Sequence, residues 1–405
     1  MVYKGRVARP VASSRASIYV HFPYCLEKCP YCDFVSYKVD RSEIAHTEYT
    51  NAVITELELR AQSLRNGGQS YEIASVFFGG GTPSLWEPTE LARVISRAKE
   101  LFATSEDLEI TVECNPTSLD EARASALAAA GVNRLSIGTQ SLENEQLTYL
   151  GRLHDADGAV RAIRDAQRSP IKRISTDLIF GLPDQSPENA AAQAKRLAEL
   201  GLSHLSCYQL TIEPGTRFGE LARRGRLPLA DDGHVAAGFL AIDEALTAQG
   251  FVHYEISNYA KPGEEARHNL GYWRGEDYVA VGCGAYGCVT TPTGKVRYRN
   301  DVSPSAYIEA AHTALAANGV GDGAIVEPLA PETLLKERIM LGLRLVDGFN
   351  LRLAAEALGI DPWPSERRRT ADALVSRGRL LVDGDTLSIP KAGWLYTDDT
   401  AARLF

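Results

Sequence analysis

The chain has 405 residues, of which 44% are hydrophobic, and a formal net charge of −9. This length exceeds one ordinary hydrophobic core, so we expect a main domain with a smaller appended one. An acidic chain is a poor candidate for broad nucleic-acid binding, and no apolar run approaches the roughly 20 residues that a membrane-spanning helix needs.

The first residues are basic, with Lys4, Arg6, Arg9 and Arg15, but no apolar segment of a secretory signal follows them. We therefore expect residues 1–16 to be a solvated leader and the protein to be cytoplasmic. Seven cysteines, three of them close together, also fit a reducing compartment better than a disulfide framework.

Three cysteines, Cys25, Cys29 and Cys32, lie in one short loop after a segment typical of a strand. Thiolates are soft ligands that select zinc, copper(I) or iron–sulfur clusters. A closed zinc site takes four ligands, and none of the other four cysteines is an obvious fourth by its spacing. The pattern indicates a cluster with one open iron. The alternatives are a zinc loop completed by a distant histidine, and unconnected buried thiols.

After this loop, segments typical of strands alternate with segments typical of helices. We expect the first helix to begin at Ser42, and the one after the third strand to begin at the capping box Ser118-Leu-Asp-Glu121. The alternation predicts parallel strands with right-handed crossovers, in a partial barrel or a doubly wound open sheet. The later strands are expected over 72–78, 108–113, 134–138, 173–180 and 204–212, and the helices over 42–64, 89–102, from 118–121 onward, 143–150, 155–167 and 187–200.

Glycine and polar residues stand where the predicted strands end. The segment Gly79-Gly80-Gly81-Thr82-Pro83 would free backbone amides and let a ligand approach closely. Glu113 and Asp177 are carboxylates at the ends of apolar strands; the alternative is that each pairs with an arginine such as Arg134 or Arg173. Because one mouth of a barrel gathers such strand ends, these residues indicate a site there.

The second half of the chain has one informative motif. Helices are expected over 218–250 and a strand over 251–259, before His268-Asn269-Leu270-Gly271-Tyr272-Trp273 in an exposed loop. The imidazole can ligate iron, and the aromatic faces suit a porphyrin. Taken alone, a histidine in a loop is more often structural or solvated than a ligand.

The C-terminal part reads as a separate module. A tight glycine-rich turn over 282–287 and an irregular linker over 304–331 precede it. Helices near 334–345, 351–358 and 371–377, and a hairpin over 379–389, indicate a winged-helix-like domain. Only scattered arginines support nucleic-acid contact there, so we expect none. The expected divisions are a leader 1–16, a core 17–250, a connecting region 251–330 and a C-terminal domain 331–405.

The pattern Tyr-x-His-x-Pro-x-Cys-x3-Cys-x-Tyr-Cys, which begins at Tyr19, resembles the signature of the radical S-adenosylmethionine (SAM) superfamily, in its coproporphyrinogen oxidase and haem chaperone branch. The resemblance implies an α/β fold: a partial (β/α)6 TIM-like barrel with a mostly helical C-terminal domain. It also implies that the three thiolates hold a [4Fe-4S] cluster whose fourth iron binds SAM. An electron from a donor such as a flavodoxin or ferredoxin then generates a 5′-deoxyadenosyl radical.

The same resemblance implies a set of SAM-binding residues around the cluster. Two are tyrosines that flank the cysteine loop, and the others lie at or just after the ends of successive strands. The implied set is Tyr19, Tyr31, Gly80, Gly81, Thr82, Glu113, Gln140, Arg152, Asp177 and Thr211.

The His-Asn-x-x-Tyr-Trp motif resembles the haem-binding motif of the chaperone branch, which implies that His268 ligates haem beside Asn269, Tyr272 and Trp273. Phe34 stands where the oxidases have a further cysteine. Both features favour a chaperone that binds haem and delivers it to respiratory proteins. The alternatives are an oxygen-independent coproporphyrinogen III oxidase, which converts propionates to vinyl groups, and, less in keeping with the acidic charge, a tRNA-modifying enzyme. The sequence leaves open whether the chain forms a homodimer or contacts a membrane peripherally.

Overall fold

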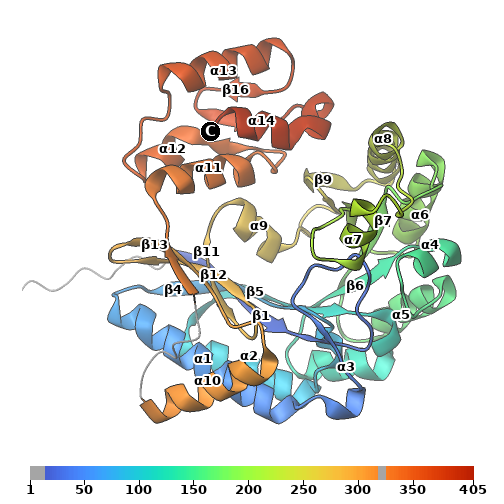
Figure 1. Ribbon diagram of the computed structural model, residues 1–405, viewed down its shortest axis with the longest axis vertical. Coiled ribbons are helices and arrows are strands. Elements are labelled where there is room, and N and C mark those ends of the chain that lie inside the picture. The colour runs from blue at the N-terminus through green and yellow to red at the C-terminus, as the bar shows by residue number, and fades with distance from the viewer. Residues whose placement is uncertain (1–13, 318–324) are drawn as a thin grey trace, which may run out of the picture.

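The computed structural model describes residues 14–317 and 325–405 (Figure 1). Most of the leader expected over 1–16 lies outside the described residues. Its last part, from Ser14 to Ala16, belongs to strand β1 (Ser14–Phe22) and is paired within the sheet. In the described part of the chain, no helix is both long and apolar enough to cross a membrane.

Six neighbouring parallel strands form the barrel wall, which confirms the partial barrel predicted from the alternation and the resemblance (Figure 1). A helix follows each of them in sequence, and the sheet has two free edges, so the barrel does not close. In spatial order the six strands are β1, β4 (Tyr71–Gly80), β5 (Ala103–Cys114), β6 (Arg134–Gln140), β7 (Arg173–Phe180) and β8 (His204–Gln209).

The sheet extends beyond these six strands on both sides. Strand β11 (Asp277–Val281) pairs in parallel with β1, and an antiparallel run continues outward from it. At the other edge, the predicted single strand over 251–259 is a short hairpin, because the chain turns between Glu255 and Asn258. The added strands are β9 (Val252–Glu255), β10 (Asn258–Ala260), β12 (Tyr286–Thr291), β13 (Gly294–Arg299) and β14 (Ile325–Pro328).

Most helices of the barrel pack against its outer face, whereas α7 contacts the cysteine loop. Apolar side chains such as Val20, Val112, Ile137 and Leu178 are buried in one large core cluster between strands and helices. This burial supplies the main stabilising free energy of the fold. The helices are α1 (His46–Asn66), α2 (Pro88–Leu101), α3 (Glu121–Ala129), α4 (Asn144–Tyr149), α5 (Ala156–Arg168), α6 (Pro187–Glu199), α7 (Arg217–Arg223) and α8 (Asp232–Ala248).

Two predicted helix starts are wrong by a few residues. Helix α1 begins at His46, because the 3-10 turn η1 (Arg41–Glu43) takes up the segment that begins at Ser42. Helix α3 is capped by Asp120, whose side chain accepts the backbone N–H of Arg123 at 2.7 Å. Ser118 lies one turn earlier, in η3 (Pro116–Ser118), and its hydroxyl contacts Ser84 instead. An aspartate satisfies a helix N-terminus as well as a serine does.

The segment expected to be an irregular linker contains helix α10 (Pro304–Ala317), which packs against α1. The helical C-terminal part follows it and has its own core, with Ile339, Leu374 and Leu387. The predicted hairpin is confirmed and turns at Gly384. The elements are α11 (Pro331–Gly342), β15 (Phe349–Asn350), α12 (Leu351–Glu356), α13 (Ser365–Ser376), β16 (Leu381–Asp383), β17 (Thr386–Ser388), η4 (Lys391–Tyr396) and α14 (Thr397–Arg403).

Glu56 on α1 joins the barrel to the strands that extend it. Its carboxylate accepts from the Gly282 N–H at 3.0 Å, the Asn300 amide at 2.9 Å and the Tyr307 hydroxyl at 2.7 Å, and pairs with Arg60 at 2.9 Å. These partners come from the end of β11, the end of β13 and α10. One carboxylate therefore holds three separate segments beside α1.

Replacement of Glu56 by alanine should lower the free energy of unfolding by about 3–5 kcal/mol, because it leaves a partly buried arginine and several buried donors without their acceptor. Urea denaturation monitored by circular dichroism measures this change. The control is Glu220→Ala, which removes solvent-exposed pairs with Arg223 and Arg224 and should leave the unfolding midpoint unchanged. Equal midpoints for the two variants would show that Glu56 is not a structural junction.

Candidate functional site

A cavity of about 540 Å³ occupies the interior of the incomplete barrel. It extends from the cysteine loop, at the carboxyl ends of the strands, to helix α9 (Arg267–Trp273), which contacts their amino-terminal halves. Of the predicted site residues, all but Trp273 line this cavity. The residues that the sequence placed at one barrel mouth and in one distant loop thus meet in a single space.

The cavity wall is polar because the strands alternate. On β5, Thr111 and Glu113 line the cavity, whereas Ile110 and Val112 enter the outer core. The other strands alternate in the same way. Closed TIM barrels normally fill their interior with branched apolar side chains. Here the inward positions of β6, β7 and β8 include Arg134, Ser136, Ser175, Asp177, His204 and Ser206.

Strand β1 anchors the cysteine loop through His21. The His21 Nε2–H donates to the Val35 carbonyl at 2.7 Å, so its Nδ1 accepts from the Tyr19 hydroxyl at 3.0 Å. Helix α7 fixes the middle of the loop, since the Phe218 N–H donates to the Pro30 carbonyl at 2.8 Å. Two short strands close its base, β2 (Tyr24–Cys25) and β3 (Tyr37–Lys38). The loop is thus fixed at both ends and at its centre.

Two of the three thiol groups receive hydrogen bonds from the barrel. The Thr82 hydroxyl lies 3.3 Å from the Cys25 sulfur, and Arg152 Nη1 lies 3.3 Å from the Cys29 sulfur. Burial raises the pKa of the Cys25 thiol to about 11 and also raises that of Cys32. A bound metal cluster would lower the pKa of these thiols and so convert them to thiolates. The hydrogen-bond donors of Thr82 and Arg152 would then stabilise the negative charge on the sulfurs.

The donor set fits an iron–sulfur cluster. All three cysteines line the same cavity, and each thiolate of a [4Fe-4S] cluster binds a different iron. Such a cluster does not require the three sulfurs to converge on one point. Among residues 14–317 and 325–405, no three His, Cys, Asp or Glu side chains are grouped as ligands of a single metal ion.

The glycine segment does not expose its amides as the sequence suggested. The amides of Gly81 and Thr82 donate to the carbonyls of Phe22 and Tyr24 at 2.7 and 2.9 Å, and the Gly80 amide donates to Glu113 at 3.2 Å. A Cβ on Gly81 would lie 2.7 Å from the Tyr24 carbonyl oxygen. Glycine is needed here for close packing of β4 against the start of the cysteine loop, and these residues face the cavity with groups other than their amides.

Glu113 and Asp177 form a partly buried acidic pair in the cavity wall. Burial, reinforced by the Asp177 carboxylate, raises the pKa of Glu113 to about 8. Burial likewise raises the pKa of Asp177 to about 6, although the Ser136 hydroxyl donates to it at 3.4 Å. A cationic group placed between these acids would favour their ionised forms. The suggested pairing with Arg134 or Arg173 is wrong, because both guanidinium groups pair with Glu109, at 3.8 and 2.8 Å.

The remaining predicted SAM residues lie around the end of the cavity that the cysteine loop forms. Gln140 has φ of 66°, a left-handed conformation that is uncommon outside glycine and often marks a functional site. Arg152 also donates to the Gly138 carbonyl at 2.8 Å, while its Nε has no hydrogen-bond partner in the described part of the chain. Tyr31 packs against Phe218, and Thr211 is exposed at the rim.

The expectation that His268 lies in an exposed loop is wrong. It lies in the first turn of α9, is only 2% exposed, and stacks on Phe77 at 4.7 Å. Its Nδ1 lies 2.9 Å from the Ser75 hydroxyl and its Nε2 lies 3.1 Å from the Tyr272 hydroxyl. Burial lowers the pKa of His268 to about 3, so the imidazole is neutral. Trp273 lies outside the cavity, beneath the Arg344 guanidinium.

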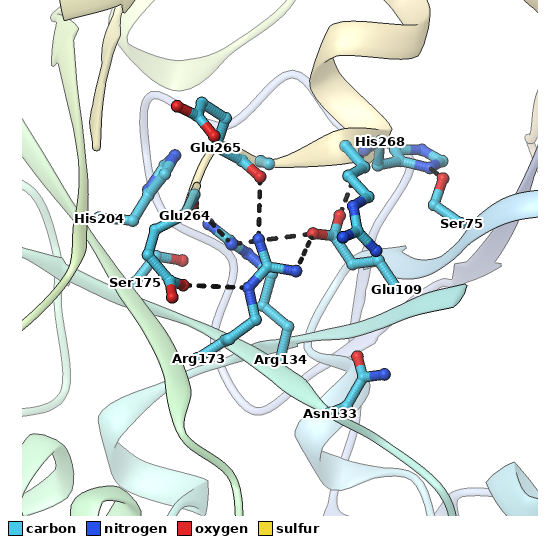
Figure 2. Close-up of polar contacts among 12 residues, drawn as sticks. Ser75, Glu109, Asn133, Arg134, Arg173, Ser175, His204, Glu264, Glu265 and His268 are labelled. Atoms are coloured by element: carbon cyan, nitrogen blue, oxygen red, sulfur yellow. Dashed lines mark hydrogen bonds and ion pairs between the residues drawn. The ribbon is translucent and has the colours of Figure 1, made fainter. Parts of the chain in front are cut away.

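An ionic cluster holds the start of α9 against the barrel (Figure 2). Arg173 donates to Glu109 at 2.8 Å, to Glu264 at 3.1 Å and to the Glu265 carbonyl at 2.9 Å. The Glu109 carboxylate in turn accepts the backbone N–H of His268 at 3.2 Å. Nothing in the sequence connects strands β5 and β7, which carry Glu109 and Arg173, with the His268 motif. The signal that was available is the polar residue at every second position of these strands, which marks a polar inner face.

The comparisons with known proteins agree with this architecture. The Radical SAM superfamily model matches residues 19–197, and the HemN C-terminal domain model matches residues 329–396. The structure of coproporphyrinogen III oxidase (HemN) from Escherichia coli, described as a radical SAM enzyme, superposes with a TM-score of 0.77 over 98% of this chain and 91% of its own. At 20% identity, that likeness shows the fold alone.

Two curated relatives are closer in sequence. The heme chaperone HemW of Haemophilus influenzae is 39% identical over 72% of this chain and 75% of its own length. The heme chaperone HemW of Mycobacterium tuberculosis is 33% identical over 98% of this chain and 96% of its own. Identity at this level over most of both chains, with a matching fold, shows that the protein belongs to the radical SAM family of HemW heme chaperones.

Proposed function

We propose that this protein is a cytoplasmic haem chaperone that binds a [4Fe-4S] cluster, SAM and haem and transfers haem to haem-dependent respiratory proteins. The observation that carries the proposal is the single cavity lined by the three cysteines, the acidic pair and His268. The kinship with HemW heme chaperones supports the same assignment.

At the end of the cavity formed by the cysteine loop, Cys25, Cys29 and Cys32 would hold the cluster. When bound, the cluster supplies an open iron for SAM and the electron that cleaves it. The protein contributes Thr82 and Arg152 as donors to the sulfurs, and Glu113 and Asp177 as acids beside the cationic cofactor. Tyr19, Tyr31, Gly80, Gly81, Gln140 and Thr211 would complete the SAM pocket.

At the end of the cavity beside α9, His268 would ligate haem with its neutral imidazole, beside Asn269 and Tyr272. Ligation at Nε2 requires that this atom give up its hydrogen bond with the Tyr272 hydroxyl. Because His268 is enclosed, haem must reach it through the cavity or after movement of α9. Trp273 would act from outside the cavity, on the face of α9 beside the C-terminal domain.

Replacement of His268 by phenylalanine should weaken ferric haem binding at least about tenfold and alter the Soret band, because the ring stays but the iron ligand is lost. Anaerobic titration of cluster-loaded protein with ferric haem measures the affinity. The matched control is His312→Phe, at an exposed histidine on α10, which should bind haem as the natural protein does. Undiminished affinity and an unchanged Soret band in the first variant would remove His268 from the haem site.

SAM affinity should rise about three- to tenfold between pH 6.5 and 8.5. Glu113, whose pKa lies near 8, is largely protonated at the lower pH and ionises as the pH rises, and only its ionised form attracts the cationic cofactor. Equilibrium dialysis with cluster-loaded protein measures the affinity. Glu113→Gln should bind SAM with little dependence on pH. Glu106→Gln, at an exposed position on β5, should keep the pH dependence of the natural protein. A variant at position 113 with the natural pH profile would contradict the role of Glu113.

An anaerobic turnover assay separates the chaperone from the coproporphyrinogen III oxidase alternative. Protein with a reconstituted cluster is mixed with a reductant, SAM and coproporphyrinogen III, and porphyrin products and 5′-deoxyadenosine are quantified. We expect no divinyl product, in keeping with Phe34 at the cavity where the oxidases have a further cysteine. Cys29→Ser, which should lose the cluster, gives the background. Conversion of stoichiometric coproporphyrinogen to the divinyl product would overturn the chaperone assignment.

A further inference from the structure

The end of the cavity beside α9 contains buried hydrogen-bonding groups that have no partner within the described residues. Arg134 Nη2, His204 Nδ1 and Thr111 Oγ1 are all buried and have no hydrogen-bond partner among the described residues. Each of the three residues is 2% exposed and lines the cavity. Leaving such groups unpaired costs free energy, so their joint presence in one cavity indicates a ligand that pairs with them.

The sheet register brings these three residues together. Thr111 on β5 pairs directly with Arg134 on β6, and Arg134 pairs with Arg173 on β7. His204 on β8 pairs with Ser175, the next inward residue after Arg173. The donors therefore lie on three of four adjacent strands, β5, β6 and β8, nearer the amino-terminal ends of the strands than the acidic pair.

Neighbouring contacts fix the orientation of the donors. Arg134 Nη1 donates to the Glu264 carbonyl at 3.2 Å, which leaves Nη2 free (Figure 2). The Tyr254 hydroxyl accepts the Ala266 N–H at 3.2 Å and lies 2.8 Å from His204 Nε2. His204 Nε2 is the one acceptor that the described residues offer to the hydrogen of this hydroxyl, so we assign that hydrogen to Nε2 and the imidazole hydrogen to the unpaired Nδ1. Burial lowers the pKa of His204 well below its usual range, so the ring carries only this one hydrogen.

The charges around these donors select the class of ligand. Arg134 and Arg173 are already matched by Glu109 and Glu264, so the cluster is close to neutral. A dianion such as phosphate would bring two uncompensated negative charges into this nearly neutral cluster, whereas a carboxylate brings one. A carboxylate has two acceptor oxygens and one charge, which suits one guanidinium N–H, one imidazole N–H and one hydroxyl.

We propose that Thr111, Arg134 and His204 form a subsite for the carboxylate of a tetrapyrrole propionate, a proposal that rests on the haem-binding function given above. His268 contacts Ser75 on β4, and Arg134 lies two strands away, a separation of roughly 10 Å. A ring ligated at His268 would therefore place its edge in the direction of the subsite. The subsite fixes how the porphyrin is oriented, because only an edge that carries a propionate can satisfy it.

The test compares ferric haem with its dimethyl ester, in which both propionates are blocked. Cluster-loaded protein is titrated with each under anaerobic conditions, and the Soret band reports binding. The natural protein should bind the free acid at least about tenfold more tightly than the ester, because the ester has lost its charge. Thr111→Val, which keeps the side-chain shape, and His204→Phe should both reduce this ratio severalfold.

Thr400→Val is the matched control, since the Thr400 hydroxyl is also buried with no partner within residues 14–317 and 325–405, but lies in the C-terminal domain. It should keep the natural ratio, and its thermal midpoint should match that of Thr111→Val. Equal affinity for acid and ester in the natural protein, or an unchanged ratio in both cavity variants, would overturn the subsite and leave the chaperone function standing. Failure of the natural protein to bind either form would overturn both.

Discussion

The polar inner face of the incomplete barrel is the constraint on which the rest of the structure depends. Apolar side chains on one face of each strand enter the core between sheet and helices, so the opposite face must be directed inward. That inner face carries serines, acids and arginines rather than the branched residues that fill closed barrels. Every one of these groups needs a partner inside the barrel, and the chain itself supplies only some of them.

Helix α9 provides many of the partners at the amino-terminal end. The segment leading into it gives the carbonyls of Glu264 and Glu265 to Arg134 and Arg173, and its first turn gives the His268 N–H to Glu109 (Figure 2). The C-terminal domain then packs on this region: the Ile256 N–H donates to the Arg344 carbonyl and the Val346 N–H to the Tyr254 carbonyl. The C-terminal domain thus contacts the His268 motif in two ways: Arg344 lies over Trp273, and Val346 is hydrogen-bonded to Tyr254, whose hydroxyl accepts the Ala266 N–H just before α9.

The two ends of the cavity differ in their electrostatics. Toward the cysteine loop, two acids with raised pKa values line the same cavity as the thiols, an arrangement that favours a cation. At the α9 end, the acids are already paired with arginines, and the groups that remain are donors, which favour an anion. A single space therefore offers complementary sites for a sulfonium and a carboxylate, the charged groups of the two organic ligands in the proposed function.

The sequence by itself determined the cysteine loop, the six alternating strands and helices, and the residues at the strand ends, because these depend on local spacing and periodicity. It misplaced the His268 motif, treated the α10 segment as a linker and offered no acid partner for Arg134 and Arg173 other than Glu113 and Asp177, which was the alternative that the structure excludes. Those features depend on contacts between residues far apart in the chain, such as Glu109 with Glu264 through Arg173, or Glu56 with Tyr307. Local patterns carry no information about such partners. Only the tertiary structure decided that His268 faces the same cavity as the cysteines, because the groups that enclose it, Ser75, Phe77 and Glu109, lie on strands far from α9 in the sequence.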